Sequence, residues 1–327
     1  MKAIVYTSYG TPDVLQLREV ATPVPKDNEL LVRVHATTVN RTDCANLSAK
    51  PFIMRFSLGL SKPKNQILGT EFSGIVEAAG KDVTSFKVGD KLFGFYDGVL
   101  SSYAEYLTVS EDKGLETMPA NISFEQAAAS LEGAHYAYNF INKVDLKKGD
   151  KVLVNGASGG IGSATVQLLK YFEVDVTATC DTKNLELIKS LGAGKVIDYT
   201  TTDFTLDDEQ YDCVFDSVGK STFGKCKRLL KPGGTYISSE LGPYVQNVFY
   251  ALITLAIGRL PFQEGKGVKF PYPPDIKRTA ILIKKLIEEG KFKPVIDRTY
   301  PLEQIADAFR YVGKGLKTGN VVITIKS

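Results

Sequence analysis

A predicted strand, a glycine-rich turn and a predicted helix follow one another without interruption in residues 151–171. The apolar run Lys151–Asn155 is typical of a buried strand, and the residues from Gly156 to Gly162 are almost all small. Glycine allows the backbone to turn tightly and to approach a ligand closely. The N-terminus of the following helix, which we expect at Ser163, offers unpaired N–H groups and a positive dipole end to an anion. This order therefore predicts a site for the pyrophosphate of a dinucleotide.

The composition narrows the class of protein further. The chain has 327 residues, which is more than one domain usually contains, so we expect two domains. Its formal net charge of +3 gives no reason to expect nucleic acid or an anionic membrane as a partner. The longest apolar segment, residues 245–260, includes polar residues and is shorter than the about 20 residues that span a bilayer. A buried or interface helix is therefore predicted there, without membrane insertion.

The cysteines and the N-terminal residues indicate the cellular compartment in which the protein is expected. The four cysteines are scattered through the chain and form no C-x-x-C pair, which fits a reducing compartment. The N-terminal residues have the pattern of a strand and contain no apolar stretch long enough for a signal peptide. We therefore expect a cytoplasmic protein.

Strands and helices are expected to alternate from residue 151 onward. Helices are predicted over residues 183–191 and 225–230, the second stopped by Pro232-Gly233-Gly234. Such alternation is typical of an α/β fold with a doubly wound parallel sheet. The strands are predicted at residues 151–155, 174–179, 195–198, 211–216 and 235–239.

The flanking parts of the chain have a different character. Residues up to about 121 contain short β-branched runs, such as Glu29 to Val39, which predict strands. A capped helix is predicted from Ser123 to Ala137, because Ser123 precedes an acidic residue, an amide and an alanine run. After Pro274, helices are predicted at residues 276–289 and 302–311 and a strand at residues 320–325.

Short motifs spread along the chain carry a family resemblance. They are Gly69-Thr70-Glu71-Phe72-Ser73-Gly74, Val88-Gly89-Asp90-Lys91, the glycine-rich turn, Leu191-Gly192-Ala193, Val196-Ile197-Asp198-Tyr199, Asp216-Ser217-Val218-Gly219 and Thr318-Gly319-Asn320-Val321-Val322. In this order and spacing the chain resembles the medium-chain dehydrogenase/reductase superfamily of zinc alcohol dehydrogenases and zinc-free quinone reductases. The resemblance implies a Rossmann domain at residues 123–271 and a GroES-like, β-rich substrate domain formed by residues 1–122 and 272–327.

The positions that hold zinc in the alcohol dehydrogenase branch carry other residue types here. In that branch a Cys, a His and a third Cys or Asp bind the catalytic zinc. Counting along the motifs places Asn40, Thr70 and Glu132 of this chain at those three positions. Catalytic zinc prefers imidazole and thiolate ligands, and the four-cysteine structural zinc lobe is missing as well. The chain has two histidines, and His35 lies in a predicted strand, where a packed or surface role is expected. The resemblance is therefore to the metal-free, quinone-oxidoreductase-like branch, and no zinc is expected.

Loss of zinc changes the chemistry that the resemblance implies. Oxidation of a simple alcohol becomes difficult, because no metal stabilises the alkoxide. Hydride transfer from a nicotinamide to an electron-poor acceptor stays feasible, and the zinc-free relatives reduce quinones or α,β-unsaturated carbonyls in this way. The protein then supplies positioning and hydrogen-bond donors for the developing oxyanion. The resemblance therefore predicts an NAD(P)H-dependent oxidoreductase with a small-molecule quinone or enone substrate.

Four residues are candidates for this chemistry. The resemblance implies that Asn40 lies near the nicotinamide, where its amide could donate to a substrate carbonyl; stabilisation of a turn is the alternative. Thr42 falls where alcohol dehydrogenases keep a proton-relay hydroxyl. Tyr136 falls where relatives often carry a threonine beside the nicotinamide, and it is either a donor or an aromatic filler. Glu132 is a catalytic or polar-anchor residue.

The choice between NADPH and NADH depends on the end of the second strand of the parallel sheet. About twenty residues beyond the last glycine lies Asp181, and a carboxylate there binds the ribose hydroxyls of NAD and repels the 2′-phosphate of NADP. Lys183 and Tyr199 favour NADP instead. Lys183 lies two residues after Asp181, and relatives place a tyrosine near the 2′-phosphate at the position of Tyr199. The resemblance favours NADPH, with NAD as the alternative. By position it also places at the cofactor Ser158, Gly159, Gly160, Ile161, Ser217, Val218, Ser239, Leu241 and Asn320.

Two alternatives to a quinone or enone reductase stay open. Asp181 and Thr42 are compatible with an NAD(H)-dependent alcohol or aldehyde oxidoreductase. A non-catalytic dinucleotide-binding sensor is also compatible, because the fold alone does not establish turnover. Residues 241–274 are expected to carry substrate specificity, either by capping a cleft or by packing on a second subunit, and the resemblance implies a homodimer.

Overall fold

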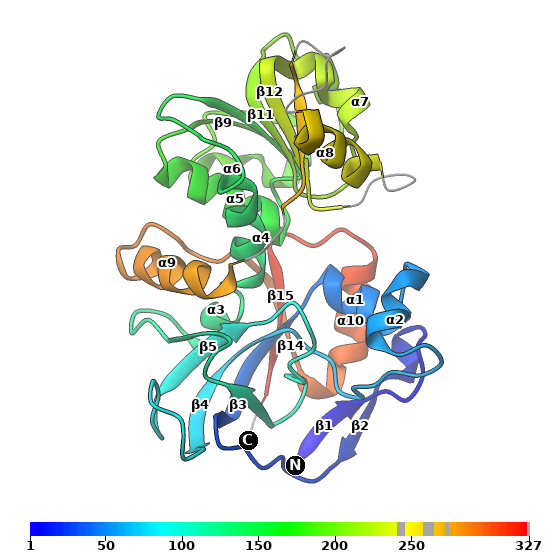
Figure 1. Cartoon of the computed structure of the whole chain (residues 1–327), viewed down its shortest axis with the longest axis vertical. Helices are drawn as coiled ribbons and strands as arrows, with labels where there is room; N and C mark the ends of the chain where they lie inside the picture. Colours follow the sequence, from blue (N-terminus) through cyan, green and yellow to red (C-terminus); the bar gives the residue numbers. More distant parts are fainter. Residues whose placement is uncertain (241–245, 258–264, 272–274, 326–327) are drawn as a thin grey trace. The chain divides into compact units, whose positions relative to one another are not determined.

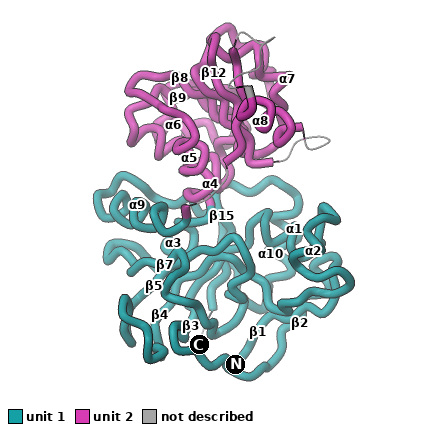
Figure 2. Tube along the Cα trace, in the orientation of Figure 1, with its two compact units in different colours: residues 1–132, 276–327 teal, residues 133–275 magenta. Residues whose placement is uncertain are grey.

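The computed structural model describes residues 1–240, 246–257, 265–271 and 275–325, and the chain divides into two compact units (Figure 2). Unit 1 consists of Met1–Glu132 and Ile276–Ser327, and unit 2 of Gly133–Asp275. The predicted first boundary, at residue 122, lies before helix α3 (Phe124–Ala128), but α3 packs on strands of unit 1. The predicted class is confirmed, since a parallel α/β sheet occurs together with a β-rich domain.

A seven-stranded sheet forms the centre of unit 1. Its longest strand, β3 (Glu29–Val39), alternates buried and half-buried residues before it becomes buried on both faces. The strand order is β14-β15-β3-β4-β5-β7, and β6 also pairs with β3. The last strand of the chain therefore lies beside one of the first. The other strands are β4 (Glu71–Ala79), β5 (Lys91–Phe95), β6 (Tyr106–Ser110), β7 (Gly114–Thr117), β14 (Ile296–Pro301) and β15 (Asn320–Thr324), and a separate pair is formed by β1 (Lys2–Val5) and β2 (Gln16–Glu19).

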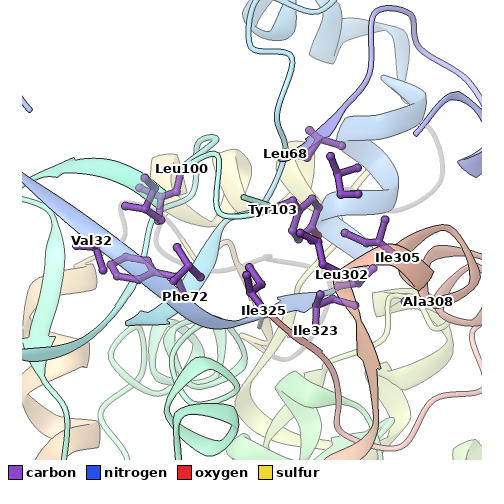
Figure 3. Packing of buried hydrophobic residues seen from close by; sticks show 14 of the residues in the cluster. Val32, Leu68, Phe72, Leu100, Tyr103, Leu302, Ile305, Ala308, Ile323 and Ile325 are labelled. Carbon is purple, nitrogen blue, oxygen red and sulfur yellow. The ribbon is translucent and has the colours of Figure 1, made fainter. Parts of the chain in front are cut away.

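The hydrophobic core of unit 1 joins side chains from both ends of its sequence (Figure 3). Val32 and Phe72 come from β3 and β4, whereas Ile305 and Ile323 come from helix α10 and strand β15, and all four are buried. Helices α1 and α10 also lie side by side (Figure 1). The C-terminal segment is therefore part of this core. The helices of unit 1, apart from α3, are α1 (Arg41–Ser48), α2 (Arg55–Leu58), α9 (Ile276–Glu288) and α10 (Ile305–Gly313).

Unit 2 contains six parallel strands in the order β10-β9-β8-β11-β12-β13. Numbered from β8, this is the order 3-2-1-4-5-6 of a doubly wound dinucleotide-binding sheet. The predicted Rossmann fold is thereby confirmed. The strands are β8 (Lys151–Asn155), β9 (Asp175–Cys180), β10 (Lys195–Asp198), β11 (Tyr211–Asp216), β12 (Leu230–Ser238) and β13 (Gly267–Lys269), and the helices, after α4 (Glu132–Ile141), are α5 (Gly160–Tyr171), α6 (Leu185–Leu191), α7 (Phe223–Cys226) and α8 (Gln246–Ile257).

The helix predicted over residues 225–230 is wrong at its C-terminal end. Helix α7 ends at Cys226, and β12 already begins at Leu230. Pro232 lies inside this strand instead of stopping a helix. The ladder with β11 pairs Tyr211 with Leu230 and then Cys213 with Thr235, so the register shifts across the Pro-Gly-Gly segment. An irregularity of this kind tolerates a proline, because no N–H is needed there.

The helix predicted over residues 123–137 is interrupted. Helix α3 ends at Ala128 and α4 begins at Glu132. The backbone N–H groups of Leu131 and Glu132 donate to the carboxylate of Glu71, at 2.6 and 2.8 Å. A side chain from β4 therefore caps α4 and ends the continuity that the alanine run favours.

The predicted apolar helix within residues 245–260 corresponds to α8. Among the residues that the structure describes, no helix combines the length and apolar character needed to cross a membrane.

Candidate active site

Glu132 lies at the centre of a buried polar cluster in unit 1. It is the first residue of α4 and is 4% exposed. Its Oε2 accepts hydrogen bonds from Asn40 Nδ2 (3.0 Å) and Thr70 Oγ1 (3.1 Å), and its Oε1 accepts one from Thr42 Oγ1 (2.7 Å). Burial raises the pKa of Glu132, and these hydrogen bonds oppose the rise. The three positions counted for zinc ligands thus meet in space, together with Thr42.

Asn40 is held by the junction of β3 and α1. It is the N-cap residue of α1, and its backbone N–H donates to Asp43 Oδ2 (2.8 Å), which stabilises the first turn. Its side-chain Nδ2 also donates to Thr38 Oγ1 (3.1 Å), in addition to Glu132. Both amide hydrogens therefore have partners within unit 1. Donation to a substrate carbonyl, as predicted, requires the exchange of one of these bonds.

Glu71 forms a second buried carboxylate beside this cluster. One oxygen accepts the two backbone N–H groups at the start of α4, and the other accepts from Thr38 Oγ1 (2.9 Å). Glu71 is 1% exposed, and burial followed by the charge of Glu132 raises its pKa to about 8. Asp43 is fully buried as well, and burial and Glu132 raise its pKa. The cluster therefore holds three carboxyl groups that resist ionisation.

Lys317 completes the cluster, and our sequence analysis did not single it out. Its Nζ donates to Asn40 Oδ1 (3.1 Å) and to the carbonyl oxygen of Gly319. Loss of solvent lowers the pKa of this ammonium, whereas the charges of Glu132 and Asp297 raise it. The signal available in the sequence was a lysine directly before the Thr318-Gly319-Asn320 motif. Its side-chain partner Asn40, however, lies between β3 and α1, far away in the chain.

The residues at the counted zinc positions do not fit a catalytic zinc ion. Asn40 and Thr70 point hydrogen-bond donors at Glu132, and a lysine ammonium touches Asn40. Zinc needs deprotonated nitrogen or sulfur ligands and an open position. Among the described residues, no group of three or more His, Cys, Asp or Glu is arranged to hold a metal ion.

The two histidines lie outside this cluster. His35 stacks on Phe124 with ring centroids 4.2 Å apart, and burial lowers its pKa. His135 is fully buried, and its Nε2 lies 3.1 Å from Asn139 Nδ2. Both histidines are therefore packed side chains.

The glycine-rich turn in unit 2 has the geometry that a pyrophosphate site requires. Strand β8 ends at Asn155, Gly156 has a φ of +80°, and α5 begins at Gly160 after the N-cap residue Gly159. A Cβ on Gly162 would lie 2.2 Å from the carbonyl oxygen of Gly156. The predicted residues 158–161 are half-buried at the start of α5, where the first N–H groups of a helix have no intrahelical acceptor.

A Gly162→Ala variant is expected to lose both stability and nucleotide binding. Its new Cβ would collide with backbone atoms of Gly156 and Ala157, at a cost of about 1–3 kcal/mol. Isothermal titration with NADPH should show affinity at least about 10-fold weaker, the equivalent of about 1.4 kcal/mol. Gly224→Ala, where the new Cβ meets no atom closer than 3.8 Å, is the control. Unchanged affinity in the Gly162 variant would contradict this account of the turn.

The three residues predicted to select the cofactor lie at one edge of the parallel sheet. Asp181 follows β9, accepts a hydrogen bond from Asn184 Nδ2, and its Oδ2 lies 3.7 Å from Lys183 Nζ. Tyr199 follows β10, is 51% exposed, and its N–H donates to the carbonyl oxygen of Cys180 (3.1 Å). Parallel strands place their carboxyl ends together, so this is the edge where a ribose would bind.

The ends of β11 and β12 meet at the same edge. Ser217 and Val218 follow β11, and a Cβ on Gly156 would lie 2.7 Å from Val218 Cβ. Ser239 follows β12, and its N–H donates to the carbonyl oxygen of Asp216 (3.1 Å). The predicted cofactor residues of unit 2 that the structure describes thus border one edge. Leu241 lies outside the described residues.

Tyr136 and Asn320 are the remaining predicted residues. Tyr136 is half-buried on α4, with its ring centroid 5.6 Å from that of His135. Asn320 is buried at the start of β15, and its Nδ2 donates to the carbonyl oxygens of Ala129 (3.2 Å) and Val295 (3.1 Å). The contacts of Asn320 therefore belong to the framework of unit 1.

Comparisons with known proteins agree with this architecture. Residues 26–120 match the alcohol dehydrogenase GroES-like domain, and residues 191–323 match the zinc-binding dehydrogenase domain. A 2-methylene-furan-3-one reductase from Solanum lycopersicum is 34% identical, with 99% of this chain and 79% of the relative covered. A quinone-oxidoreductase homolog of the chloroplast of Spinacia oleracea is 32% identical, with 99% of this chain and 98% of the relative covered. The structure of a quinone oxidoreductase from Coxiella burnetii superimposes with a TM-score of 0.85 at 27% identity, covering 100% of this chain and 99% of that one.

A Rossmann sheet with a glycine-rich turn, joined to a GroES-like domain, defines the class of alcohol dehydrogenase-like oxidoreductases. The chain belongs to the medium-chain dehydrogenase/reductase superfamily, in its quinone-oxidoreductase-like branch, and is an oxidoreductase. The glycine-rich turn and the edge residues of unit 2 fit a nicotinamide dinucleotide, because the start of α5 offers N–H groups without intrahelical acceptors and the absence of a side chain at Gly162 lets the helix pack closely on the turn.

Proposed function

We propose that this protein reduces quinones or activated α,β-unsaturated carbonyl compounds with NAD(P)H, without zinc. The observation that carries the proposal is the cluster of Asn40, Thr70 and Glu132, which replaces a zinc donor set by hydrogen bonds and a lysine contact. The names of the relatives support the substrate class, since they include an NADPH-dependent alkenal/one oxidoreductase of Arabidopsis thaliana, 31% identical over 99% of this chain and 79% of the relative.

The nicotinamide, when bound, supplies a hydride, which adds to a quinone or to the β-carbon of an enone. The developing oxyanion then needs hydrogen-bond donors, and a proton must follow to complete the reduction. We assign donor roles to Asn40 and Tyr136 and a proton-relay role to Thr42. Glu132 has an anchoring role, because its two oxygens accept from Asn40 and Thr42 and so orient them. Solvent supplies the proton.

The decisive assay follows the oxidation of NADPH and of NADH at 340 nm with five acceptors, with and without a chelator. The acceptors are a benzoquinone, a naphthoquinone, an alkenal, an enone and a simple aldehyde. Turnover of a quinone or enone that resists the chelator would support the proposal. Turnover of the aldehyde alone would favour the alcohol or aldehyde oxidoreductase, and nucleotide binding without any turnover would favour the sensor.

The cofactor preference that we propose, NADPH over NADH by a narrow margin, leads to a prediction for Asp181. The Asp181 carboxylate lies 3.7 Å from Lys183 Nζ and would repel a 2′-phosphate. Asp181→Ser removes that repulsion and leaves Lys183 able to pair with the 2′-phosphate. The ratio of kcat/KM for NADPH to kcat/KM for NADH should therefore rise about 10-fold or more. Asp175→Ser, at the opposite end of β9, is the matched control. A ratio that stays constant or moves toward NADH would contradict the proposed role.

We also propose a cytoplasmic location and a homodimer. The described cysteines are all free, which supports a reducing compartment. Gel filtration with light scattering and fractionation of the source cell test these two proposals.

A further inference from the structure

Lys317 and Glu132 bind opposite ends of the same amide group. Lys317 Nζ donates to Asn40 Oδ1 (3.1 Å), whereas Asn40 Nδ2 donates to Glu132 Oε2 (3.0 Å). An amide has an acceptor end and a donor end, and a lysine ammonium can only donate. If the Asn40 amide were reversed, its NH2 group would face the ammonium and its oxygen would face the carboxylate. The two charges therefore select one orientation of Asn40.

Most of the other charged groups near this amide are acidic, and Arg41, the first residue of α1, adds a further positive charge. The titratable groups that face Glu132 or Lys317 are Asp43, Cys44 and Tyr103, together with Glu71 on β4 and Asp297 on β14. The ammonium of Lys317 lowers the pKa of Glu132 and so opposes the effect of burial. Positive charge at this place favours a carboxylate over a carboxylic acid at Glu132.

We propose that Lys317 is a positioning residue of this site: its ammonium holds the Asn40 amide in one orientation and supplies a positive charge that favours the carboxylate form of Glu132. The catalytic consequence rests on the proposed function, whereas the coupling of Lys317 to Glu132 does not. The residue acts through Asn40 and Glu132, without contact with the reacting atoms.

The coupling is tested first by stability, which requires no turnover. The variants are Lys317→Met, Lys317→Arg and, as a control, Lys314→Met, which changes an exposed lysine of the same segment. Burial already makes folded Glu132 bind a proton more readily than the unfolded chain does, and loss of the ammonium strengthens this preference. The folded state of the variant should therefore lose more stability than the wild type as the pH rises. The melting temperature of Lys317→Met should therefore fall further below that of the wild type at pH 8 than at pH 5. Lys317→Arg should restore most of the difference.

A second variant separates charge coupling from damage to the fold. In a Glu132→Gln background, Lys317→Met should produce a loss of melting temperature that no longer changes with pH. If the loss in the single Lys317→Met variant is the same at every pH, or if it changes with pH equally in the Glu132→Gln background, the proposed coupling is overturned.

The catalytic consequence is tested by the pH profile of kcat/KM with the best acceptor. In Lys317→Met the acid limb should move upward by about one pH unit or more, because a nearby opposite charge shifts a carboxyl pKa by that amount. Lys317→Arg should keep the wild-type limb, and Lys314→Met should keep the wild-type profile. An unshifted limb in an active Lys317→Met variant overturns the catalytic role of Lys317. If the wild type itself reduces no acceptor, the proposed function fails, and the stability measurements still decide the coupling.

Discussion

Glu132→Ala is expected to lower the free energy of unfolding by about 3–5 kcal/mol, because it removes the acceptor of three hydrogen bonds, two of them buried, and a negative charge close to the Lys317 ammonium. Asn40 and Thr42 would lose the anchor that orients them. Displacement of catalytic donors by about 1 Å can cost about 10²-fold in rate, so kcat/KM for the best acceptor should fall by a similar factor. Denaturant unfolding and steady-state kinetics measure the two effects.

Glu125→Ala is the control for Glu132→Ala. Glu125 belongs to the neighbouring helix α3, is half-buried, and lies in its first turn. Its replacement should cost about 1 kcal/mol or less, the value of a carboxylate at a helix N-terminus. Similar losses in the two variants would show that Glu132 is an ordinary helix-start residue, and the cluster would then have no special energetic role.

Glu71→Gln is expected to reduce the dependence of stability on pH. The pKa of Glu71 is raised to about 8 in the folded protein, above the value of about 4.3 in an unfolded chain. The folded state therefore holds a proton that the unfolded state has released, and the stability from this group is present below pH 4 and is lost as the pH rises through 8. Between pH 5 and 7 the loss approaches about 1.4 kcal/mol per pH unit. In Glu71→Gln this contribution disappears, and the curve of unfolding free energy against pH becomes flatter.

Glu77→Gln provides the comparison on the same strand. Glu77 also lies on β4, but it is exposed and pairs with Arg33. The curve for this variant should have the wild-type slope. If Glu71→Gln also keeps the wild-type slope, Glu71 is ionised throughout this range, and its three hydrogen bonds outweigh its burial.

The parallel sheet was predictable because its signals are local. The apolar run of β8, the glycines that follow it, and the alternation of strands with helices lie in consecutive residues, and the observed strand order agrees with the predicted Rossmann fold. The errors occurred where a distant group overrides a local preference. Glu71 caps α4 and interrupts the predicted helix at residues 123–137, and the shifted register with β11 draws Pro232 into β12.

The polar cluster around Glu132 was predicted only in part from the sequence. Counting along the family motifs placed Asn40, Thr70 and Glu132 at the three positions of one zinc ligand set, but it did not predict the hydrogen bonds among them. The pairing of β3 with β4 brings Asn40 and Thr70 to the Glu132 carboxylate, and the pairing of β15 with β3 brings Lys317 there from the C-terminal segment.

The sequence by itself determined the fold class and the family and predicted a dinucleotide site, because glycine spacing and strand–helix alternation act over short distances along the chain. Only the tertiary structure decided which charges share the buried cluster, that Lys317 binds the oxygen of the Asn40 amide, and which carboxyl groups have raised pKa values. Burial and electrostatic coupling depend on distances between residues that are far apart in the sequence, and no local pattern encodes those distances.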